Sequence, residues 1–185
     1  MLIKTKVENK QYEKLIDYAS KKCDAVMFVA RKDGFDQKQI KLLDKTFSDL
    51  KKELKNNFIK SRNGSYWVHT KVGNKQLGLT HFKDPYNFDD LFKVEFYRID
   101  STTKKYLLTN KNMYNWLNPK YPEDLSFFSK GYCWLYSVAH EEICYIYCEN
   151  EIEYEYLKSI GIEFVDDKYI PTKREDLYYE KYGVN

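Results

Sequence analysis

Residues 125–147, which read LSFFSKGYCWLYSVAHEEICYIY, decide the fold class. The stretch contains three short runs rich in aromatic and β-branched residues, over 125–128, 132–138 and 143–147, and such runs are typical of β-strands. The connections between these runs are only a few residues long. Connections this short join antiparallel neighbours, because parallel strands need a crossover of a dozen or more residues. We therefore predict three successive antiparallel strands.

Two helices and a strand are predicted before residue 60. Apolar residues recur every three or four positions over 8–22, and again from Asp36 to about Phe58, which indicates two amphipathic helices. Asp36 has the side chain of a good N-cap for the second helix. Between the two helices, the apolar run 25–29 predicts a buried strand within residues 24–31.

The middle of the chain predicts two hairpins. Residues 65–72 alternate in strand fashion, and Gly73-Asn74 fits a tight turn that returns the chain over 75–82. A second hairpin is predicted from the strand 92–99 through a turn at 101–103 into 105–109. A short helix over 112–117 follows, and Pro119 ends it.

The C-terminal part predicts two further helices and a strand. The acidic segment 149–160 predicts a short helix, followed by a strand over 162–165. Residues 173–182 predict a polar terminal helix. The residues expected to face inward from the acidic helix are Ile152, Tyr156 (or Tyr154) and Ile160.

The strands come in hairpin groups between helices, and strict alternation of strand and helix is missing. This pattern favours an α+β fold with a mainly antiparallel sheet packed by N-terminal, central and C-terminal helices. We expect residues 1–185 to form a single domain, because no Pro-, Gly- or Ser-rich linker interrupts them. The one subdomain boundary suggested by the sequence lies near 118–122, where two prolines coincide with a change in charge.

Composition narrows the class of protein. Hydrophobic residues make up 43% of the 185-residue chain, which excludes a disordered chain that could not offset its conformational entropy. No apolar run approaches the roughly 20 residues that a membrane span needs, so we expect no membrane association. The chain starts without a signal-peptide core, and its four cysteines therefore indicate reduced thiols in the cytoplasm.

Charge is divided along the chain. Residues 1–120 carry 25 Lys and Arg against 14 Asp and Glu, a net charge of +11, whereas residues 121–185 carry 6 against 14, a net charge of −8. Such asymmetry points to binding partners. The alternative is that the two parts fold together and neutralise each other.

Candidate catalytic residues centre on His140. A cysteine nucleophile needs a basic partner within hydrogen-bond reach, and the best available set is Cys133 with His140 and Glu142. Ser137 with His140 is a second set. A small cysteine- or serine-dependent hydrolase is therefore an alternative function, although no established catalytic motif supports it and we expect no enzyme.

Two patterns point to zinc, and neither meets the requirements of a site. His140-Glu141-Glu142 resembles the start of a zinc-protease helix, but Cys144 stands where the second histidine is needed. Cys133, Cys144 and Cys148 with His140 lack the closely paired spacing of structural sites. We expect no metal and no cofactor, and interpret the three cysteines as core residues.

Lysines suggest a second alternative, a nucleic-acid-binding protein. Lys41, Lys45, Lys52 and Lys55 lie off the apolar stripe of their helix and could contact phosphates. The cluster around Lys60 and Arg62 includes Lys71, Lys75 and two aromatic residues, Tyr66 and Trp67, that could stack on bases. The chain has only four arginines, however, and base-reading proteins depend on arginine.

The acidic C-terminal third is the most distinctive feature. Six glutamates fall within positions 141–155 and are interleaved with tyrosines. Carboxylates among aromatic rings suit the capture of a basic protein surface, because complementary charge favours fast association and aromatic anchors supply binding energy. The predicted partner-binding residues are Trp134, Tyr136, Glu141, Glu142, Glu151, Glu153 and Glu155.

Two segments, YPEDLSFF at 121–128 and WLYSVAHEE at 134–142, resemble a pattern in small uncharacterised proteins of clostridial-type, low-GC Gram-positive bacteria. Some of those relatives look like immunity proteins encoded beside toxins. The resemblance implies a bacterial or phage inhibitor of the immunity or anti-defence type, and it identifies no catalytic residue. With the acidic face, it makes a non-enzymatic binding protein the leading hypothesis.

Overall fold

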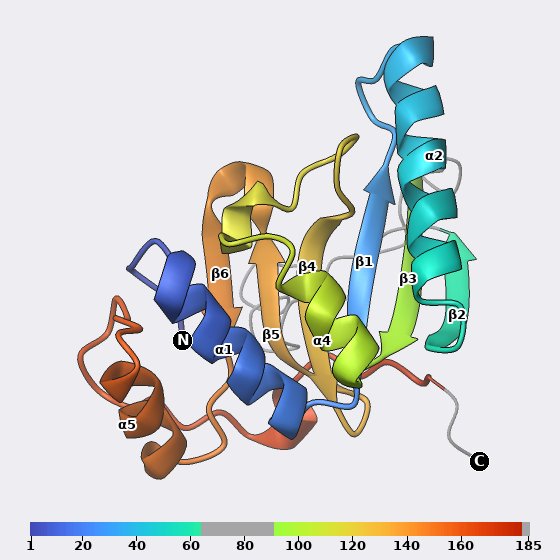
Figure 1. Cartoon of the computed structure of the whole chain (residues 1–185). Coiled ribbons are helices and arrows are strands. Elements are labelled where there is room, and N and C mark those ends of the chain that lie inside the picture. Colours follow the sequence, from blue (N-terminus) through green and yellow to red (C-terminus); the bar gives the residue numbers. More distant parts are fainter. Residues whose placement is uncertain (64–90, 183–185) are drawn as a thin grey trace.

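A computed structural model describes residues 1–63 and 91–182. Within these residues one six-stranded sheet has the order β2-β3-β1-β4-β5-β6, and every neighbouring pair is antiparallel (Figure 1). This confirms the α+β fold and the antiparallel sheet. The strands are β1 (Ala25–Arg31), β2 (Phe58–Asn63), β3 (Phe92–Arg98), β4 (Glu123–Ser129), β5 (Tyr132–Val138) and β6 (Ile143–Ile146).

Strand β1 lies inside the sheet, between β3 and β4. Its residues from Ala25 to Ala30 are all buried, because both faces of the sheet are covered at this strand. Val26 and Phe28 belong to the core on one face, and Met27 and Val29 to the core on the other. A strand buried on both faces needs a continuous apolar run, which is what residues 25–30 provide.

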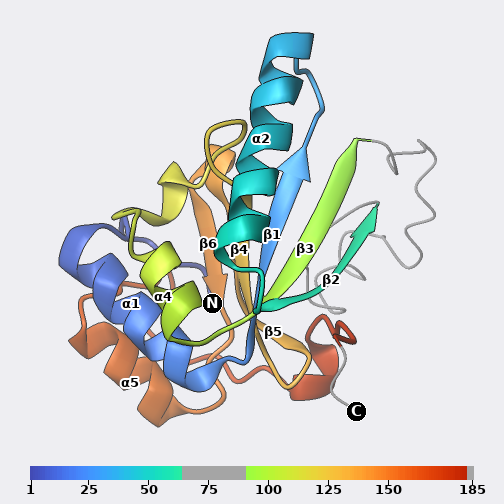
Figure 2. The ribbon, with the colours of Figure 1, turned by 45° about the vertical axis from the view of Figure 1, so that its right-hand side comes forward.

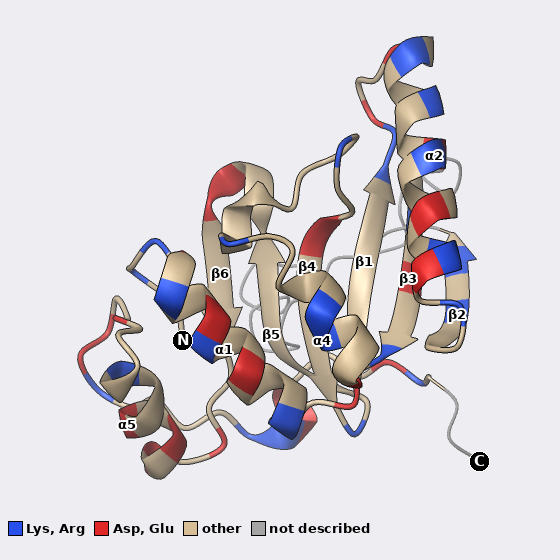
Figure 3. Cartoon of the chain, viewed as in Figure 1, with Lys and Arg blue, Asp and Glu red and all other residues tan. Residues whose placement is uncertain are grey.

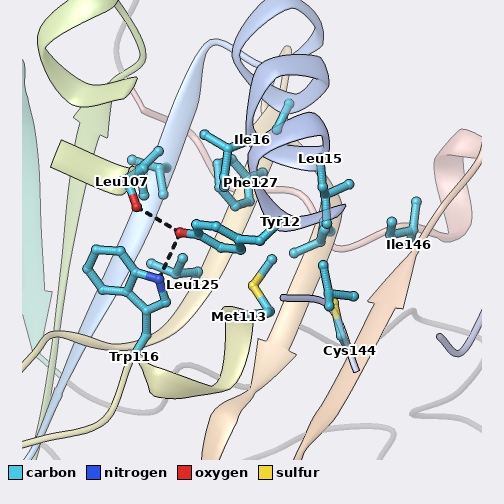
Figure 4. Packing of buried hydrophobic residues seen from close by; sticks show 14 of the residues in the cluster. Tyr12, Leu15, Ile16, Leu107, Met113, Trp116, Leu125, Phe127, Cys144 and Ile146 are labelled. Carbon is cyan, nitrogen blue, oxygen red and sulfur yellow. Dashed lines mark hydrogen bonds between the residues drawn. The ribbon is translucent and has the colours of Figure 1, made fainter. Parts of the chain in front are cut away.

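The helices α1 (Asn9–Lys22), α2 (Gln37–Glu53), α4 (Ser101–Leu107) and α5 (Glu151–Ser159) contribute to the core on one face of the sheet. Figures 1 and 2 show α1, α2 and α4 in one layer against the strands. At the centre of this core, Tyr12 Oη donates to the Leu107 carbonyl at 2.9 Å and accepts from Trp116 Nε1 at 2.9 Å (Figure 4). Both polar groups are thereby satisfied inside an apolar interior.

The C-terminal segment covers the other face. Leu177 and Tyr182 pack there with residues of β1, β3 and β5. The helix predicted over 173–182 is wrong: the segment forms a 3₁₀ turn at Arg174–Asp176 and then an extended run. Backbone contacts with β5 explain the difference, since Cys133 N donates to the Tyr178 carbonyl at 2.9 Å.

Two other predicted elements differ in the structure. Helix α2 ends at Glu53, and Phe58 begins β2, so Phe58 does not continue the helical stripe. The predicted turn and strand over 101–109 are wrong, because residues Ser101–Leu107 form α4. Asp100 caps this helix by accepting hydrogen bonds from the backbone amides of Thr102 and Thr103.

Helix α5 is present where it was expected, but a different face of the helix is buried from the one predicted. Tyr154 and Leu157 are buried, whereas Ile152 is 82% exposed and Tyr156 is 43% exposed. The expectation that Ile152 and Tyr156 face inward is therefore wrong, whereas the alternative Tyr154 and the expected Ile160 are buried. The predicted strand 162–165 contributes one bridge, from Phe164 to Ile3.

The hairpin predicted at 65–82, with His69 and His81, lies outside the described residues. In the described part of the chain, no helix combines the length and apolar character needed to cross a bilayer.

Candidate functional site

Helix α5 presents an exposed face that combines apolar and acidic side chains. Ile152 and Tyr156 are one helical turn apart, and so are Glu151 and Glu155, so the four side chains are neighbours on the helix surface. Glu151 and Glu155 are also exposed. We call Glu151, Ile152, Glu155 and Tyr156 the α5 face.

The charges of the α5 face are largely free of internal partners. Glu155 lies 3.8 Å from Lys158 on the same helix, a loose pair between exposed groups that contributes little. Within the described residues, Glu151 makes no ion pair or hydrogen bond through its side chain. Residues 149–167 carry seven acidic residues against one lysine, so the end of the molecule around α5 is acidic, as Figure 3 shows, while many lysines lie on α2 at the other end.

Glu153 and Trp134, both predicted as partner contacts, are instead internal. Glu153 is 5% exposed and Trp134 is 2% exposed. Trp134 Nε1 donates to Glu153 Oε1 at 2.8 Å, and Lys22 Nζ lies 3.0 Å from the same oxygen. Neither residue is available to a partner, because both serve to join α5 to β5 and α1.

Tyr136 also lies away from the predicted surface. It is 6% exposed and belongs to the core on the opposite sheet face from Trp134. Its ring stacks on Tyr145 with centroids 5.1 Å apart. A bulge separates the two predicted contacts: Phe128 pairs with Cys133 and Phe127 with Leu135, which leaves Trp134 as an extra residue.

The remaining predicted glutamates are exposed, but lysines of the N-terminal part neutralise some of the acidic residues. Glu142 lies 3.1 Å from Lys6, and Glu149 lies 3.6 Å from Lys22. Glu141 is exposed beside His140 in the connection between β5 and β6. The acidic surface expected over 141–155 is thus divided, and its unpaired part is centred on α5.

The structure does not bring together either set of residues that was considered for a hydrolase. Ser137 is 2% exposed and donates to the Leu125 carbonyl at 3.1 Å. Cys133 is fully buried near the start of β5, whereas His140 follows the end of that strand. The strand from Cys133 to Val138 alone spans roughly 16 Å, so His140, which follows it, cannot activate this thiol.

Burial also keeps the cysteines protonated. Burial raises the pKa of Cys133 and Cys144 well above the ordinary thiol value, and burial is the largest cause for Cys148, whose pKa is raised to about 12. A thiolate is the form that attacks a substrate or binds a metal. These three cysteines therefore pack as core residues, as the sequence indicated.

His140 has two acidic neighbours, Glu123 and Asp124, at the start of β4. Glu123 begins β4, and its Oε1 lies 3.0 Å from His140 Nδ1. Asp124 accepts a hydrogen bond from the Ala139 amide at 2.6 Å, and Arg31 Nη1 lies 3.1 Å from His140 Nε2. The signal in the sequence was the pair Glu123-Asp124 directly before the predicted strand 125–128. The burial of both carboxylates could not be predicted, because charged residues beside a proline are usually exposed.

A hollow of about 280 Å³ lies beside the start of α5. Its walls include Tyr132, Trp134 and Tyr147, and both Glu149 and Arg174 line it. The Arg174 guanidinium lies 4.6 Å from the centroid of the Tyr132 ring. Because the hollow carries charges of both signs, it does not select a ligand of one charge.

The α2 lysines do not form an uninterrupted basic stripe. Lys41, Lys45 and Lys52 are exposed on α2, as predicted, and Lys55 is exposed just beyond the end of the helix. Asp44, Asp49 and Glu53 are exposed on the same helix. The mixed charge gives no specific support to nucleic-acid binding.

Comparison of the chain with protein-family models, with curated proteins and with solved structures finds no match.

Proposed function

We propose that this protein binds a partner protein with a basic surface and masks that surface stoichiometrically, without catalysis, through the α5 face. The observation that carries the proposal is Ile152, which is 82% exposed between acidic neighbours on a well-packed helix. Burying a side chain of this size contributes about 2 kcal/mol. A partner that covers Ile152 gains that energy.

The surroundings of Ile152 favour a basic partner. Glu151 and Glu155 flank it, and the segment 149–167 has a large excess of acidic residues. Opposite charge accelerates encounter and excludes partners of like charge. Tyr156 adds a half-exposed ring, which rests on Tyr18 with centroids 4.8 Å apart and is therefore held in place.

The α5 face is also rigid. Asn150 caps the helix by accepting from the Glu153 amide at 2.9 Å, and the buried side chain of Glu153 ties the helix to the body. A preorganised face loses less conformational entropy on binding than a flexible one. This supports tight capture, as an inhibitor or immunity protein acting in the cytoplasm would require.

The binding residues differ from those predicted. Ile152 and Tyr156 replace Trp134 and Tyr136 as the apolar anchors, while Glu151 and Glu155 are kept from the original set. Glu153 becomes the support of the helix.

A photo-crosslinking amino acid at position 152 tests the proposal in cells. We expect it to give a discrete product with one protein. The matched control carries the same group at Leu42, which is 46% exposed on α2, and we expect no such product there. The crosslinked protein is then identified, purified and titrated against the natural chain, with an expected stoichiometry of one to one.

Charge-reversal variants test the electrostatic part with the purified partner. We expect Glu151→Lys combined with Glu155→Lys to weaken binding at least tenfold at low salt. Asp49→Lys with Glu53→Lys makes the same change in net charge, with the same spacing, on exposed α2, and should leave the affinity unchanged. Equal effects of the two double variants, or no crosslink at 152, would refute the proposal.

A further inference from the structure

We propose that Glu123, Asp124 and His140 form a binding site for a divalent transition-metal ion, best represented by Zn²⁺. One ligand atom from each residue lies within 4.8 Å of the other two. Glu123 and Asp124 begin β4, and His140 follows β5, the strand that pairs with β4. Three donors from two adjacent strands therefore converge at one end of the sheet.

Both carboxylates are buried, with Glu123 4% exposed and Asp124 1% exposed. A divalent cation bound between two neighbouring buried carboxylates offsets the cost of removing their charges from water. Hydrogen bonds fix their orientation: Asn118 Nδ2 donates to Glu123 Oε2 at 2.8 Å, and the Ala139 amide donates to Asp124 Oδ1 at 2.6 Å. Such supporting bonds orient the ligands of metal sites in proteins.

The distance between His140 and Glu123 suits two ligands of one ion. His140 Nδ1 and Glu123 Oε1 are 3.0 Å apart. Ligands about 2.0 Å from zinc at tetrahedral angles are roughly 3.3 Å apart. An ion can therefore be accommodated between these atoms with a small opening of the pair, while Asp124 has to approach by a further 1–2 Å, on the order of a side-chain adjustment.

The contact with Arg31 indicates which ring nitrogen of His140 carries the proton in the metal-free protein. Its Nη1 lies 3.1 Å from His140 Nε2, and because a guanidinium always donates, Nε2 accepts and the ring proton is on Nδ1. A metal ion at Nδ1 takes the place of that proton, and the imidazole stays neutral because its single proton is then carried by Nε2. Nε2 then carries a proton and can turn to Glu141, whose Oε1 is 3.8 Å away, while Arg31 keeps its contact with Asp33 at 3.3 Å.

The donor set selects the class of metal. One imidazole nitrogen with two carboxylate oxygens suits zinc and its first-row neighbours, whereas Mg²⁺ and Ca²⁺ favour oxygen ligands alone. Glu141 adds negative charge beside the site, whereas the charge of Asp33 is paired with Arg31. The site lies at the β5–β6 connection, separated from α5 by the length of β6, so it is independent of the α5 face.

Calorimetric titration with ZnCl₂ tests the site. His140 is one of three histidines, so the titration uses both the natural chain and a His69→Gln, His81→Gln chain in which His140 is the one imidazole left. We expect one zinc ion per chain in both. Co²⁺ should give visible absorption bands of a low-symmetry site with nitrogen and oxygen ligands.

Ligand variants decide the assignment. We expect His140→Gln and Glu123→Gln to weaken zinc binding at least tenfold, and the exposed neighbour Glu142→Gln to leave it unchanged. The His140 side chain is one-third exposed, so His140→Gln should melt at the same temperature as the free natural protein. This variant therefore tests the site even if Glu123→Gln fails to fold. Unchanged zinc affinity in His140→Gln, or no zinc binding by the two parent chains, would overturn the proposal.

Discussion

The Glu153 carboxylate is a junction between three elements. Besides Trp134 and Lys22, it accepts hydrogen bonds from Tyr18 Oη at 3.2 Å and from the Glu149 amide at 2.7 Å. Its partners come from α1, β5 and the approach to α5. The carboxylate thus satisfies donors from all three elements, and removing its charge leaves Lys22 without its closest partner.

At this residue we predict a loss of stability in Glu153→Gln. The amide cannot accept from all four donors at once, and the free energy of unfolding should fall by about 2–4 kcal/mol, as for other broken buried ion pairs. Urea unfolding followed by tryptophan fluorescence measures the change. The control is Glu151→Gln on the exposed face, which should stay within about 0.5 kcal/mol of the natural chain. Equal midpoints for the two variants would contradict this role of Glu153.

At the scale of elements, the start of helix α4 is set by a capping residue, Asp100. The pattern of apolar residues does not indicate this helix. The sequence 101–109 was predicted as a turn at 101–103 followed by a strand over 105–109, which would pair with the strand 92–99 as a hairpin. The Asp100 side chain accepts from the amides of Thr102 and Thr103 and so begins α4. The seven-residue helix then buries Leu107, a tertiary contact that a short sequence window does not contain.

We predict that Asp100→Ala destabilises the protein by about 1 kcal/mol, the usual value of an N-cap. Asp100→Asn is the matched variant, because asparagine caps helices about as well as aspartate. It should retain most of the stability. Chemical unfolding of the two variants and the natural chain, under the same conditions, gives the comparison. A loss of similar size in both would show that the charge of Asp100, and not its capping bond, stabilises α4.

For α5, the sequence predicted the helix but not its orientation. Ile152 and Tyr156 share one helical face, and so do Tyr154 and Leu157, so apolar spacing alone allows either face to be buried. The buried carboxylate of Glu153 decides between them, because it is adjacent to Tyr154 and must point to Lys22 and Trp134. The sequence analysis placed Glu153 on the binding surface together with Glu151 and Glu155, and so did not use it to orient the helix.

At the scale of the whole molecule, the features that could be predicted are those formed by residues close together in the sequence. Short connections between β4, β5 and β6 gave the correct antiparallel neighbours, and the apolar run of β1 gave a buried strand. The extended path of residues 177–182 could not be predicted, because it depends on contacts with β2 and with the β4–β5 turn, far away in the chain. Gly131, for example, donates to Tyr182 Oη at 3.0 Å.

Glu180 is the main electrostatic contact of this C-terminal segment with the N-terminal part. Its carboxylate is 2.7 Å from Lys60 Nζ and 3.4 Å from Arg62 Nε, and Tyr178 Oη donates to it at 2.8 Å. Burial opposes the charged form of Glu180, but the hydrogen bond from Lys60, the charge of Arg62 and the Tyr178 hydroxyl outweigh it, so its pKa is lowered. The charge division along the sequence is thus partly an internal attraction between β2 and the C-terminal segment.

This lowered pKa fixes the sign of a pH dependence. The unfolded chain binds a proton at Glu180 near pH 4.5, the ordinary value of the carboxyl group, and the folded chain binds it at lower pH. The stabilisation from Glu180 is therefore complete above that pH and is lost as the pH falls through the folded pKa. We predict that Glu180→Gln lowers the free energy of unfolding by about 2 kcal/mol at pH 7, and that its difference from the natural chain narrows below pH 4.5. Urea unfolding between pH 3 and 7 measures both curves, and a difference that stays constant over this range would mean that the ionised carboxylate does not hold the segment.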